Sequence, residues 1–195
     1  MGIDTQLNPT SFVPPRTGNG GFMDPQRIAA LFGIREGMKI ADFGCGSGFF
    51  PIYMAKLAGK DGIVTAVDVL ETALDTVRAK AKTEGLSNIV IIRANLEVFR
   101  TSGLGDNSQD LALLANVLYE SKKKEEIIKE ANRVLKTGGG LVVIDWKKSA
   151  RGFGPPENAR MDQDSTNDLV EKSGFKFVNE IDAGAFHFGM RFRKI

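Results

Sequence analysis

A glycine-rich stretch that begins with an acidic residue is the strongest chemical signal in this sequence. It runs from Asp42 to Gly48 with the sequence DFGCGSG, between a short apolar run and a segment with helical spacing. Glycines at the turn from a buried strand to a helix let the backbone approach a nucleotide-like ligand closely. The alternative is a tight turn that needs glycine for its geometry alone. The strand and helix pattern around the loop favours the ligand site.

Two residues separate this loop from a dinucleotide-binding loop. The dinucleotide fingerprint has glycine at the position that Phe49 holds here. Asp42 places a carboxylate just before the turn, where it would repel a pyrophosphate but attract the ammonium of a methionine group. The charge pattern therefore favours S-adenosylmethionine as the cofactor. A NAD-linked oxidoreductase is a weaker alternative.

A second acidic residue, Asp68, ends the next apolar run about 20 residues after Gly48. At that spacing the carboxylate lies beside the first strand and can accept hydrogen bonds from both ribose hydroxyls. Alone, an aspartate after a strand is more often the N-cap of the following helix. Together with the glycine loop, the spacing favours the ribose.

The elements that must position these residues alternate between strand and helix. Strands are predicted by the apolar runs at 38–43, 62–67, 88–92, 111–114 and 141–144. Helices are predicted by the spacing at 49–57, 70–83, 122–135 and 165–172. This alternation is typical of parallel βαβ units. The last apolar runs, 175–181 and 187–192, are joined by too few residues for a parallel crossover, so we expect the final strand to be antiparallel.

Two segments show no regular pattern. Residues 1–23 are rich in proline and glycine and are predicted to form an arm, which is a candidate lid. Residues 146–164 are polar and predicted to cover the active edge. Asp24 and Pro25 indicate a helix start, with Ile28, Leu31 and Phe32 on its buried face. We expect one domain at 24–195.

The composition narrows the classes of function. The chain has 195 residues and a formal net charge of +2, which is too small to make nucleic acid the default partner, and no DNA substrate is expected. A single cysteine excludes an intramolecular disulfide, and no cluster has metal-ligand spacing, so no metal is expected. No apolar run has the length of a membrane span, and no secretory signal is visible. The expected location is the cytoplasm.

From about residue 24 to its end, the sequence resembles the class I S-adenosylmethionine-dependent methyltransferases, particularly the small ones similar to quinone-biosynthesis C-methyltransferases. Besides the glycine loop and Asp68, the resemblance includes ANLE at 94–97, QDLA at 109–112 and LKTGGG at 135–140, where Thr137 replaces the usual proline. It implies an α/β fold: a Rossmann-like three-layer sandwich on a mostly parallel seven-stranded sheet, with strand order 3-2-1-4-5-7-6 and the last strand antiparallel.

The resemblance also implies the cofactor contacts and the reaction. Asn95 replaces the commoner aspartate but still offers an oxygen to the adenine amine. The residues implied to bind S-adenosylmethionine are Asp42, Gly44, Cys45, Gly46, Gly48, Asp68, Val69, Asn95, Leu96 and Asn116. A small-molecule acceptor is the leading expectation. The alternatives are a protein or RNA methyltransferase and a non-catalytic subunit that binds S-adenosylmethionine.

No catalytic residue is required by the sequence. Methyl transfer from a sulfonium is an in-line displacement, in which alignment and exclusion of water supply much of the acceleration. If the acceptor must lose a proton, a base within hydrogen-bond reach is needed. The candidates are Tyr119, Glu120, Asp145 and His187, each expected at the carboxyl edge of the sheet. Each also has an ordinary structural explanation, and His187 in particular is expected to be accessible from its place in an alternating strand.

Overall fold

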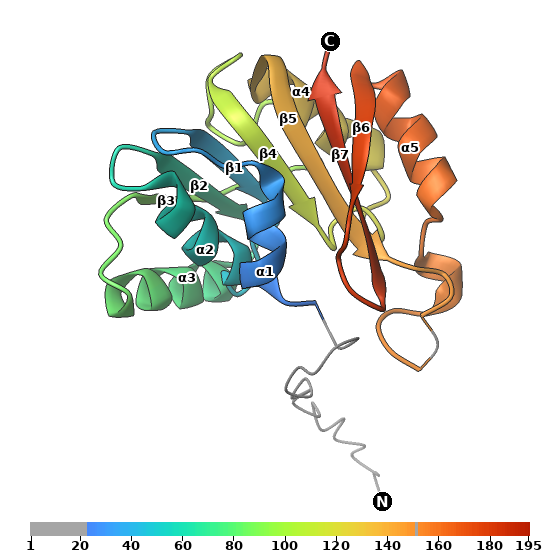
Figure 1. Cartoon of the computed structure of the whole chain (residues 1–195), viewed down its shortest axis with the longest axis horizontal. Coiled ribbons are helices and arrows are strands. Elements are labelled where there is room, and N and C mark those ends of the chain that lie inside the picture. Colours follow the sequence, from blue (N-terminus) through green and yellow to red (C-terminus); the bar gives the residue numbers. More distant parts are fainter. Residues whose placement is uncertain (1–22, 151) are drawn as a thin grey trace, which may run out of the picture.

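The computed structural model describes residues 23–150 and 152–195, and these residues form an α/β domain on one mixed sheet (Figure 1). Its strands are β1 (Lys39–Phe43), β2 (Ile63–Asp68), β3 (Ile89–Arg93), β4 (Gln109–Ala115), β5 (Leu135–Trp146), β6 (Phe175–Ile181) and β7 (His187–Lys194). Its helices are α1 (Pro25–Ala29), α2 (Phe49–Ala58), α3 (Glu71–Thr83), α4 (Lys124–Val134) and α5 (Gln163–Lys172), with short 3-10 helices at Ala30–Phe32 and Glu157–Ala159. All of the predicted strands and helices are therefore present, with ends that shift by a few residues.

The strand order is β3-β2-β1-β4-β5-β7-β6, as expected. β1 pairs in parallel with β2 and with β4, and β7 pairs antiparallel with both β5 and β6. The chain leaves β1 in one direction to form β2 and β3, and later continues on the other side of β1 with β4. The carboxyl ends of β1 and β4 therefore flank a topological switch point, which is where open α/β sheets bind their ligands.

Alternation along the strands sends side chains into two apolar layers, one on each face of the sheet. One layer contains Ile40, Leu111 and Val142 and packs against α1 and α2. The other contains Phe43, Leu114 and Val143 together with the buried side of α4, including Ile127, Ile128, Ala131 and Val134. α3 lies on the same side as α2 and covers Ala66 with Leu74 and Val77. The result is the predicted three-layer sandwich.

The first helix begins as the sequence predicts. The Asp24 side chain accepts hydrogen bonds from the backbone of Gln26 and Arg27, and Pro25 occupies the first helical position. Ile28 and Phe32 are buried, but Leu31 is 45% exposed, so its predicted burial was wrong. After Ala29 the α-helix continues as a 3-10 helix, which has fewer residues per turn. The angle between successive side chains therefore changes, and Leu31 points towards the solvent.

The predicted start of one strand was wrong, and the predicted arm is not tested by the structure. β5 begins at Leu135, well before the predicted start at 141, because Leu135 pairs with Gln109 across a register shift in β4. The next pair is Leu111 with Gly140, so residues 136–139, which include Gly138 with φ at 79°, form an irregularity within β5. The arm predicted at 1–23 lies outside the described residues except for Met23, although α1 begins at the edge of the sheet where the parallel strands end (Figure 1). None of the described helices is long and apolar enough to cross a membrane.

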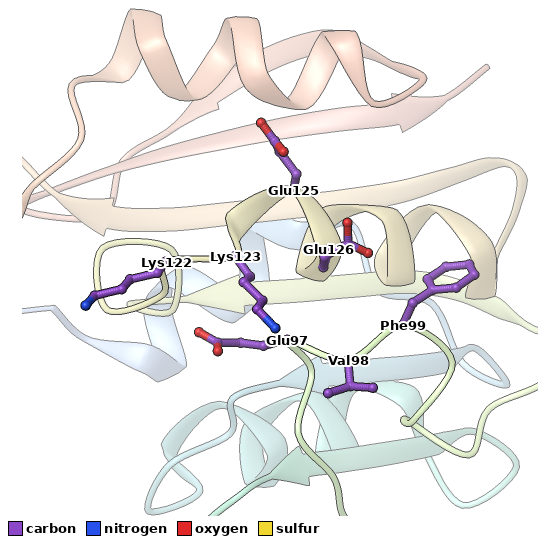
Figure 2. A pocket seen from close by; sticks show the side chains of 7 residues that line it. All are labelled: Glu97, Val98, Phe99, Lys122, Lys123, Glu125 and Glu126. Carbon is purple, nitrogen blue, oxygen red and sulfur yellow. The ribbon is translucent and has the colours of Figure 1, made fainter.

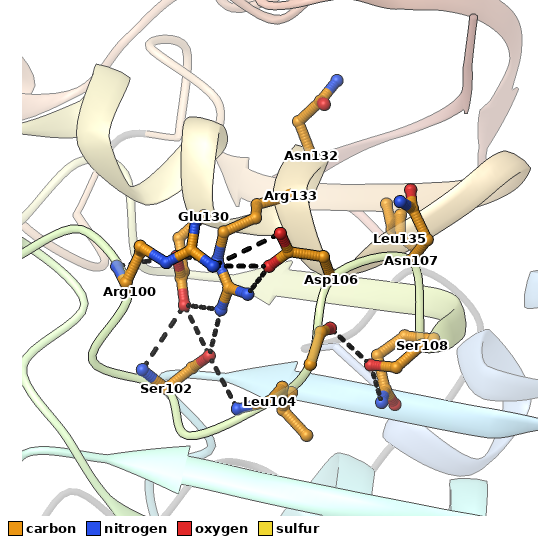
Figure 3. A network of polar contacts seen from close by, with 12 residues as sticks. Arg100, Ser102, Leu104, Asp106, Asn107, Ser108, Glu130, Asn132, Arg133 and Leu135 are labelled. Carbon is orange, nitrogen blue, oxygen red and sulfur yellow. Dashed lines mark hydrogen bonds and ion pairs between the residues drawn. The ribbon is translucent and has the colours of Figure 1, made fainter.

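A buried ion-pair network ties the segment between β3 and β4 to α4 (Figure 3). Glu130 on α4 has no exposed surface and accepts hydrogen bonds from Ser102 Oγ at 2.5 Å and from Arg133 Nη2 at 2.6 Å. Its second carboxylate oxygen accepts the backbone N–H of Arg100 at 2.9 Å, and Arg133 also contacts Asp106. These partners favour the charged form, so the pKa of Glu130 falls from 4.5 to about 2 in spite of its burial.

Replacement of Glu130 by glutamine is expected to lower the free energy of unfolding by about 3 kcal/mol at neutral pH, because it leaves Arg133 without its buried counterion. The folded-state pKa lies below the unfolded value. The stabilisation is therefore fully present above pH 4.5 and is lost as the pH falls towards 2. Urea unfolding at pH 7 and at pH 3 measures both effects. A wild-type protein that keeps its full advantage over the variant at pH 3 would contradict this explanation.

Candidate functional site

The glycine loop joins β1 to α2 at the carboxyl edge of the sheet. Gly44, Gly46 and Gly48 have φ angles of 75°, 50° and 80°, in the left-handed region that favours glycine. A Cβ atom at Gly44 would also lie 2.5 Å from a methyl group of Val117. At Gly46, by contrast, nothing among the described residues lies within 4 Å of that position. The loop thus leaves open space beside Gly46, where a ligand can approach the backbone.

Four backbone N–H groups of this loop, those of its three glycines and of Cys45, are already used within the protein. Those of Gly44 and Cys45 donate to the carbonyl of Val67 at 2.8 and 3.0 Å, and that of Gly48 donates to the carbonyl of Cys45 at 3.0 Å. The N–H of Gly46 donates to Asp68 Oδ2 at 2.8 Å. A pyrophosphate is held by free N–H groups. This hydrogen bonding therefore disfavours a dinucleotide, in agreement with the charge of Asp42.

Asp42 is a buried carboxyl group, and one of its oxygens has no hydrogen-bond donor among the described residues. It is 2% exposed, and its Oδ2 atom has no hydrogen-bond partner within the described part of the chain. Burial, with a smaller contribution from the charge of Asp68, raises the pKa of Asp42 from 3.8 to about 8. The group is therefore mostly protonated at neutral pH in the free protein. A cation placed against it would restore the carboxylate.

Asn116 supplies a second acceptor of this kind just beyond the end of β4. Its backbone is in the left-handed region, with φ at 58°, and its N–H donates to the carbonyl of Ile144 at 2.8 Å. Its Oδ1 atom is buried and has no partner among the residues that the structure describes. Buried acceptors normally have donors. Two such oxygens on neighbouring strands, Asp42 on β1 and Asn116 after β4, favour a ligand that carries several N–H donors, such as a primary ammonium.

Asp68 ends β2 and is oriented by the backbone. Oδ2 accepts the N–H of Gly46, and Oδ1 accepts the N–H of Leu70 at 2.9 Å. The helix α3 begins after Leu70, whose side chain makes no capping bond. Asp68 is therefore not the N-cap of α3, and the structural alternative considered from the sequence is wrong. Each of its carboxylate oxygens has a further lone pair with which it can accept a hydrogen bond from a hydroxyl group.

The other predicted cofactor contacts follow β2 and β3. Val69 is half exposed and comes directly after Asp68, while Leu96 is buried. Ala94 donates its N–H to the carbonyl of Asp68 at 3.0 Å, which brings the ends of these two strands together. The Oδ1 atom of Asn95 accepts the N–H of Glu97 at 3.0 Å. An adenine amine at Asn95 would have to use the second lone pair of that oxygen.

Tyr119 and Asp145 lie together at the ends of β4 and β5. Asp145 Oδ2 accepts the backbone N–H of Tyr119 at 3.1 Å, and Oδ1 accepts the N–H of Trp146 at 2.8 Å. Burial raises the pKa of Asp145 to about 6 and that of the Tyr119 hydroxyl, which contacts Glu120, well above its usual range. The Asp145 carboxylate thus positions the segment after β4. It does not pair with Lys148, which binds Asp162 instead.

His187 is only 1% exposed, so the expectation of an accessible side chain was wrong. It opens β7 opposite Trp146, and the two rings are 4.1 Å apart. Alternation along β7 places Phe188, Met190 and Phe192 in one apolar cluster. However, β7 lies between β5 and β6, and both of its faces are covered. Burial and the nearby charges of Lys147 and Arg160 lower the pKa of His187 to about 4, so the ring is neutral at pH 7.

Replacement of His187 by glutamine is expected to destabilise the fold by about 1–3 kcal/mol, since the buried ring contact with Trp146 is lost. Replacement by phenylalanine retains a ring and should keep most of the stability. Thermal unfolding of the two variants measures this difference. Equal stability of both variants and the wild type would show that the ring contact contributes nothing.

The sequence alone missed Glu97 and Ser121, which bond to each other at 2.6 Å between the segments after β3 and β4. A serine just before a helix is an N-cap signal that could have marked Ser121. An open hollow of about 470 Å³ lies beside this bond (Figure 2). It is lined by Glu97, Val98, Phe99, Lys122, Lys123, Glu125 and Glu126.

Comparison with known proteins agrees with this geometry. A family model described as a methyltransferase domain matches residues 34–179. The ubiquinone/menaquinone biosynthesis C-methyltransferase UbiE of Shewanella oneidensis is 32% identical over 117 residues, which cover 60% of this chain and 45% of that protein. The match thus spans less than half the length of this curated relative.

Solved structures share the whole fold. A crystal structure of a SAM-dependent methyltransferase from Aquifex aeolicus superimposes with a TM-score of 0.81 and 29% identity, over 89% of this chain and 91% of that one. The [4+2]-cyclase SpnF superimposes with a TM-score of 0.73, over 87% of this chain and 80% of its own, but with 17% identity. The second likeness shows the fold alone.

Proposed function

The chain belongs to the methyltransferase-domain family, and from this premise we propose that it binds S-adenosylmethionine and transfers the methyl group to a small-molecule acceptor. One observation carries the proposal. Asp42 Oδ2 and Asn116 Oδ1 are buried acceptors without donors in the described structure, and they lie on adjacent strand ends at the topological switch point. The ammonium of the methionine group offers the donors and the positive charge that these oxygens lack.

The residues present fit the remainder of the cofactor as well. The oriented carboxylate of Asp68 would hold the ribose hydroxyls, and Val69 and Leu96 offer apolar surface for the adenine. Asn95 would accept from the adenine amine. Gly44, Cys45, Gly46 and Gly48 would form the backbone wall, since the space beside Gly46 is open.

When bound, S-adenosylmethionine supplies a methyl group on a positively charged sulfur. The residues of this chain contribute by binding and alignment, because an in-line displacement needs no covalent protein intermediate. Asp145 holds the segment after β4 through the N–H of Tyr119 and so fixes one wall of the site. For an acceptor that must lose a proton, we propose Tyr119 and Asp145 as the candidates for a base, whereas the buried His187 packs against Trp146 and contributes to the fold.

We further propose that two segments close the site and exclude water. The first is the arm at 1–23, which continues into α1 at the carboxyl edge. The second follows β5, where the guanidinium of Arg160 donates to the carbonyls of Lys147, Ala150 and Pro155 at 2.9, 2.6 and 2.6 Å. A guanidinium with several carbonyl partners holds this segment in one shape, which favours a fixed cover over a swinging one.

The proposal places the reaction in the cytoplasm, which fits a sequence with one cysteine. A protein or RNA acceptor and a non-catalytic cofactor-binding subunit are the competing functions. Purified protein incubated with labelled S-adenosylmethionine and a cell extract separates them, when the extract is fractionated into metabolites, protein and RNA. We expect the label in the metabolite fraction. Label in protein or RNA would move the acceptor to that class, and no label in any fraction would favour the non-catalytic subunit.

A further inference from the structure

We infer that Glu97 and Ser121 form a clasp that sets the affinity of the site for its cofactor, with both acting as positioning residues. This inference rests on the proposed function. The Ser121 hydroxyl donates to Glu97 Oε1 at 2.6 Å, and Ser121 is 6% exposed. A short hydrogen bond to a carboxylate, partly shielded from water, is among the stronger polar contacts in proteins.

The clasp joins two segments that the sheet itself leaves apart. Glu97 belongs to the segment after β3, two residues beyond Asn95, whereas Ser121 belongs to the segment after β4, beyond Asn116. In the strand order β2 and β1 stand between β3 and β4, so no strand pairing couples these two ends. One segment carries the predicted adenine contact and the other an acceptor for the methionine group. The clasp therefore controls the separation of the two walls of the proposed site.

Local hydrogen bonds connect the clasp to the site on both sides. The N–H of Glu97 donates to Asn95 Oδ1, and the hydroxyl of Thr101 donates to the carbonyl of Asn95 at 2.6 Å. On the other side, Ser121 Oγ accepts the N–H of Lys123 at 2.9 Å, at the start of α4. A displacement of Glu97 would thus displace Asn95, while Ser121 is held against a helix end.

Packing beside the clasp comes from Leu96, which is buried in one apolar cluster with Leu118 and Ile127. The hollow of about 470 Å³ separates the start of α4 from the segment at Glu97 and Val98, and Figure 2 shows Lys123 pointing towards that segment. Val98 is 49% exposed, so it does not fill the gap. Without the Glu97–Ser121 bond, the separation of the two segments would depend on the packing of Leu96 and would be less closely fixed here.

The same segment has a second tether, which provides a matched control. Ser102 Oγ donates to Glu130 Oε1 on α4 at 2.5 Å, at the end of the segment nearer to β4 (Figure 3). Both tethers are serine–glutamate bonds between one segment and the region of α4. Only the clasp lies next to predicted cofactor contacts. Loss of the Ser102 bond should therefore reduce stability and leave cofactor affinity unchanged.

The test is a calorimetric titration of the full chain with S-adenosylhomocysteine, the demethylated product. Glu97→Ala and Ser121→Ala should each weaken binding about tenfold, the effect of losing one strong polar contact. The double variant should be no weaker than either single variant, because both remove the same bond. Glu97→Gln retains an oxygen that can accept from Ser121 and should stay within about threefold of the wild type.

Ser102→Ala should lower the melting temperature without changing the dissociation constant. Unchanged affinity in Glu97→Ala, additive losses in the double variant or an equal loss in Ser102→Ala would each overturn the clasp. Absence of binding by the wild-type protein would instead overturn the proposed function.

Discussion

Replacement of Asp42 by alanine is expected to weaken the binding of S-adenosylhomocysteine at least about a hundredfold, the largest effect that we predict for any single residue. Removal of one partner of a buried, hydrogen-bonded charge pair costs about 2–5 kcal/mol. Asp42 is almost fully buried, so water cannot take its place beside the ammonium. Calorimetry on the folded variant measures the loss. A tenfold effect or less would show that Asp42 does not bind the charged end of the cofactor.

The same residue should make binding depend on pH. In the free protein the pKa of Asp42 is about 8, and the cofactor ammonium favours the ionised carboxylate. Affinity should therefore fall as the pH is lowered from 8 towards 6, by up to about tenfold per unit. Asp42→Asn has no proton to exchange and should show no such slope. A wild-type affinity that stays constant over this range would contradict the raised pKa.

The Asp42 variant should not owe its weak binding to unfolding. Because the folded-state pKa is raised from 3.8 to about 8, the contribution of this group to stability declines as the pH rises between these values. At pH 7 the carboxyl group therefore costs the free protein stability. Asp42→Asn should melt at the same temperature as the wild type or above it. The combination of equal or higher stability with lost binding is typical of a functional site.

Replacement of Asp68 by alanine is expected to weaken S-adenosylhomocysteine binding by about 1.5–3 kcal/mol, or roughly tenfold to a hundredfold. The variant loses a charged acceptor for two ribose hydroxyls. It also leaves the N–H groups of Gly46 and Leu70 without their acceptor, so a modest fall in melting temperature should accompany the loss.

Asp68→Asn separates these two contributions. One oxygen of the amide can still accept, but the negative charge is gone. Since the Asp68 charge raises the pKa of Asp42, this variant should also shift the pH dependence of binding to lower pH. Calorimetry at several pH values measures both effects. An Asp68→Ala variant that binds as tightly as the wild type would remove Asp68 from the site.

Much of the fold could be predicted because its signals are local. The apolar runs around Ala41 and Ala112 indicated buried strands. The short link between residues 181 and 187 indicated that the last two strands are antiparallel to each other. Signals that depend on neighbouring strands were less reliable. The apolar run at 141–144 indicated a strand that starts at 141, but the pairing of Leu135 with Gln109 puts the start of β5 at Leu135. Leu31 was misplaced because the helical period changed within one turn.

The site was predictable in its residues but not in its electrostatics. The spacing of Asp42, Gly48 and Asp68 pointed to a nucleotide-like cofactor, and the structure gathers these residues at one edge. Asp42 Oδ2 has no donor in the part of the chain that the structure describes, and burial together with the nearby charge of Asp68 raises the pKa of Asp42. Neither can be read from sequence spacing. His187 shows the same limit, because alternation assigns a face to a side chain but does not say whether that face is covered.

The likeness to SpnF shows that one fold supports different reactions, so methyl transfer is supported by the residues of the site and not by the architecture alone. The most direct test of cofactor binding is the melting temperature of the full chain with S-adenosylmethionine, S-adenosylhomocysteine or NAD. At 100 times its dissociation constant, a bound ligand adds about 2.7 kcal/mol to stability. The two methionine compounds should raise the melting temperature and NAD should not. Equal stabilisation by NAD, or none by either methionine compound, would contradict the proposed S-adenosylmethionine site.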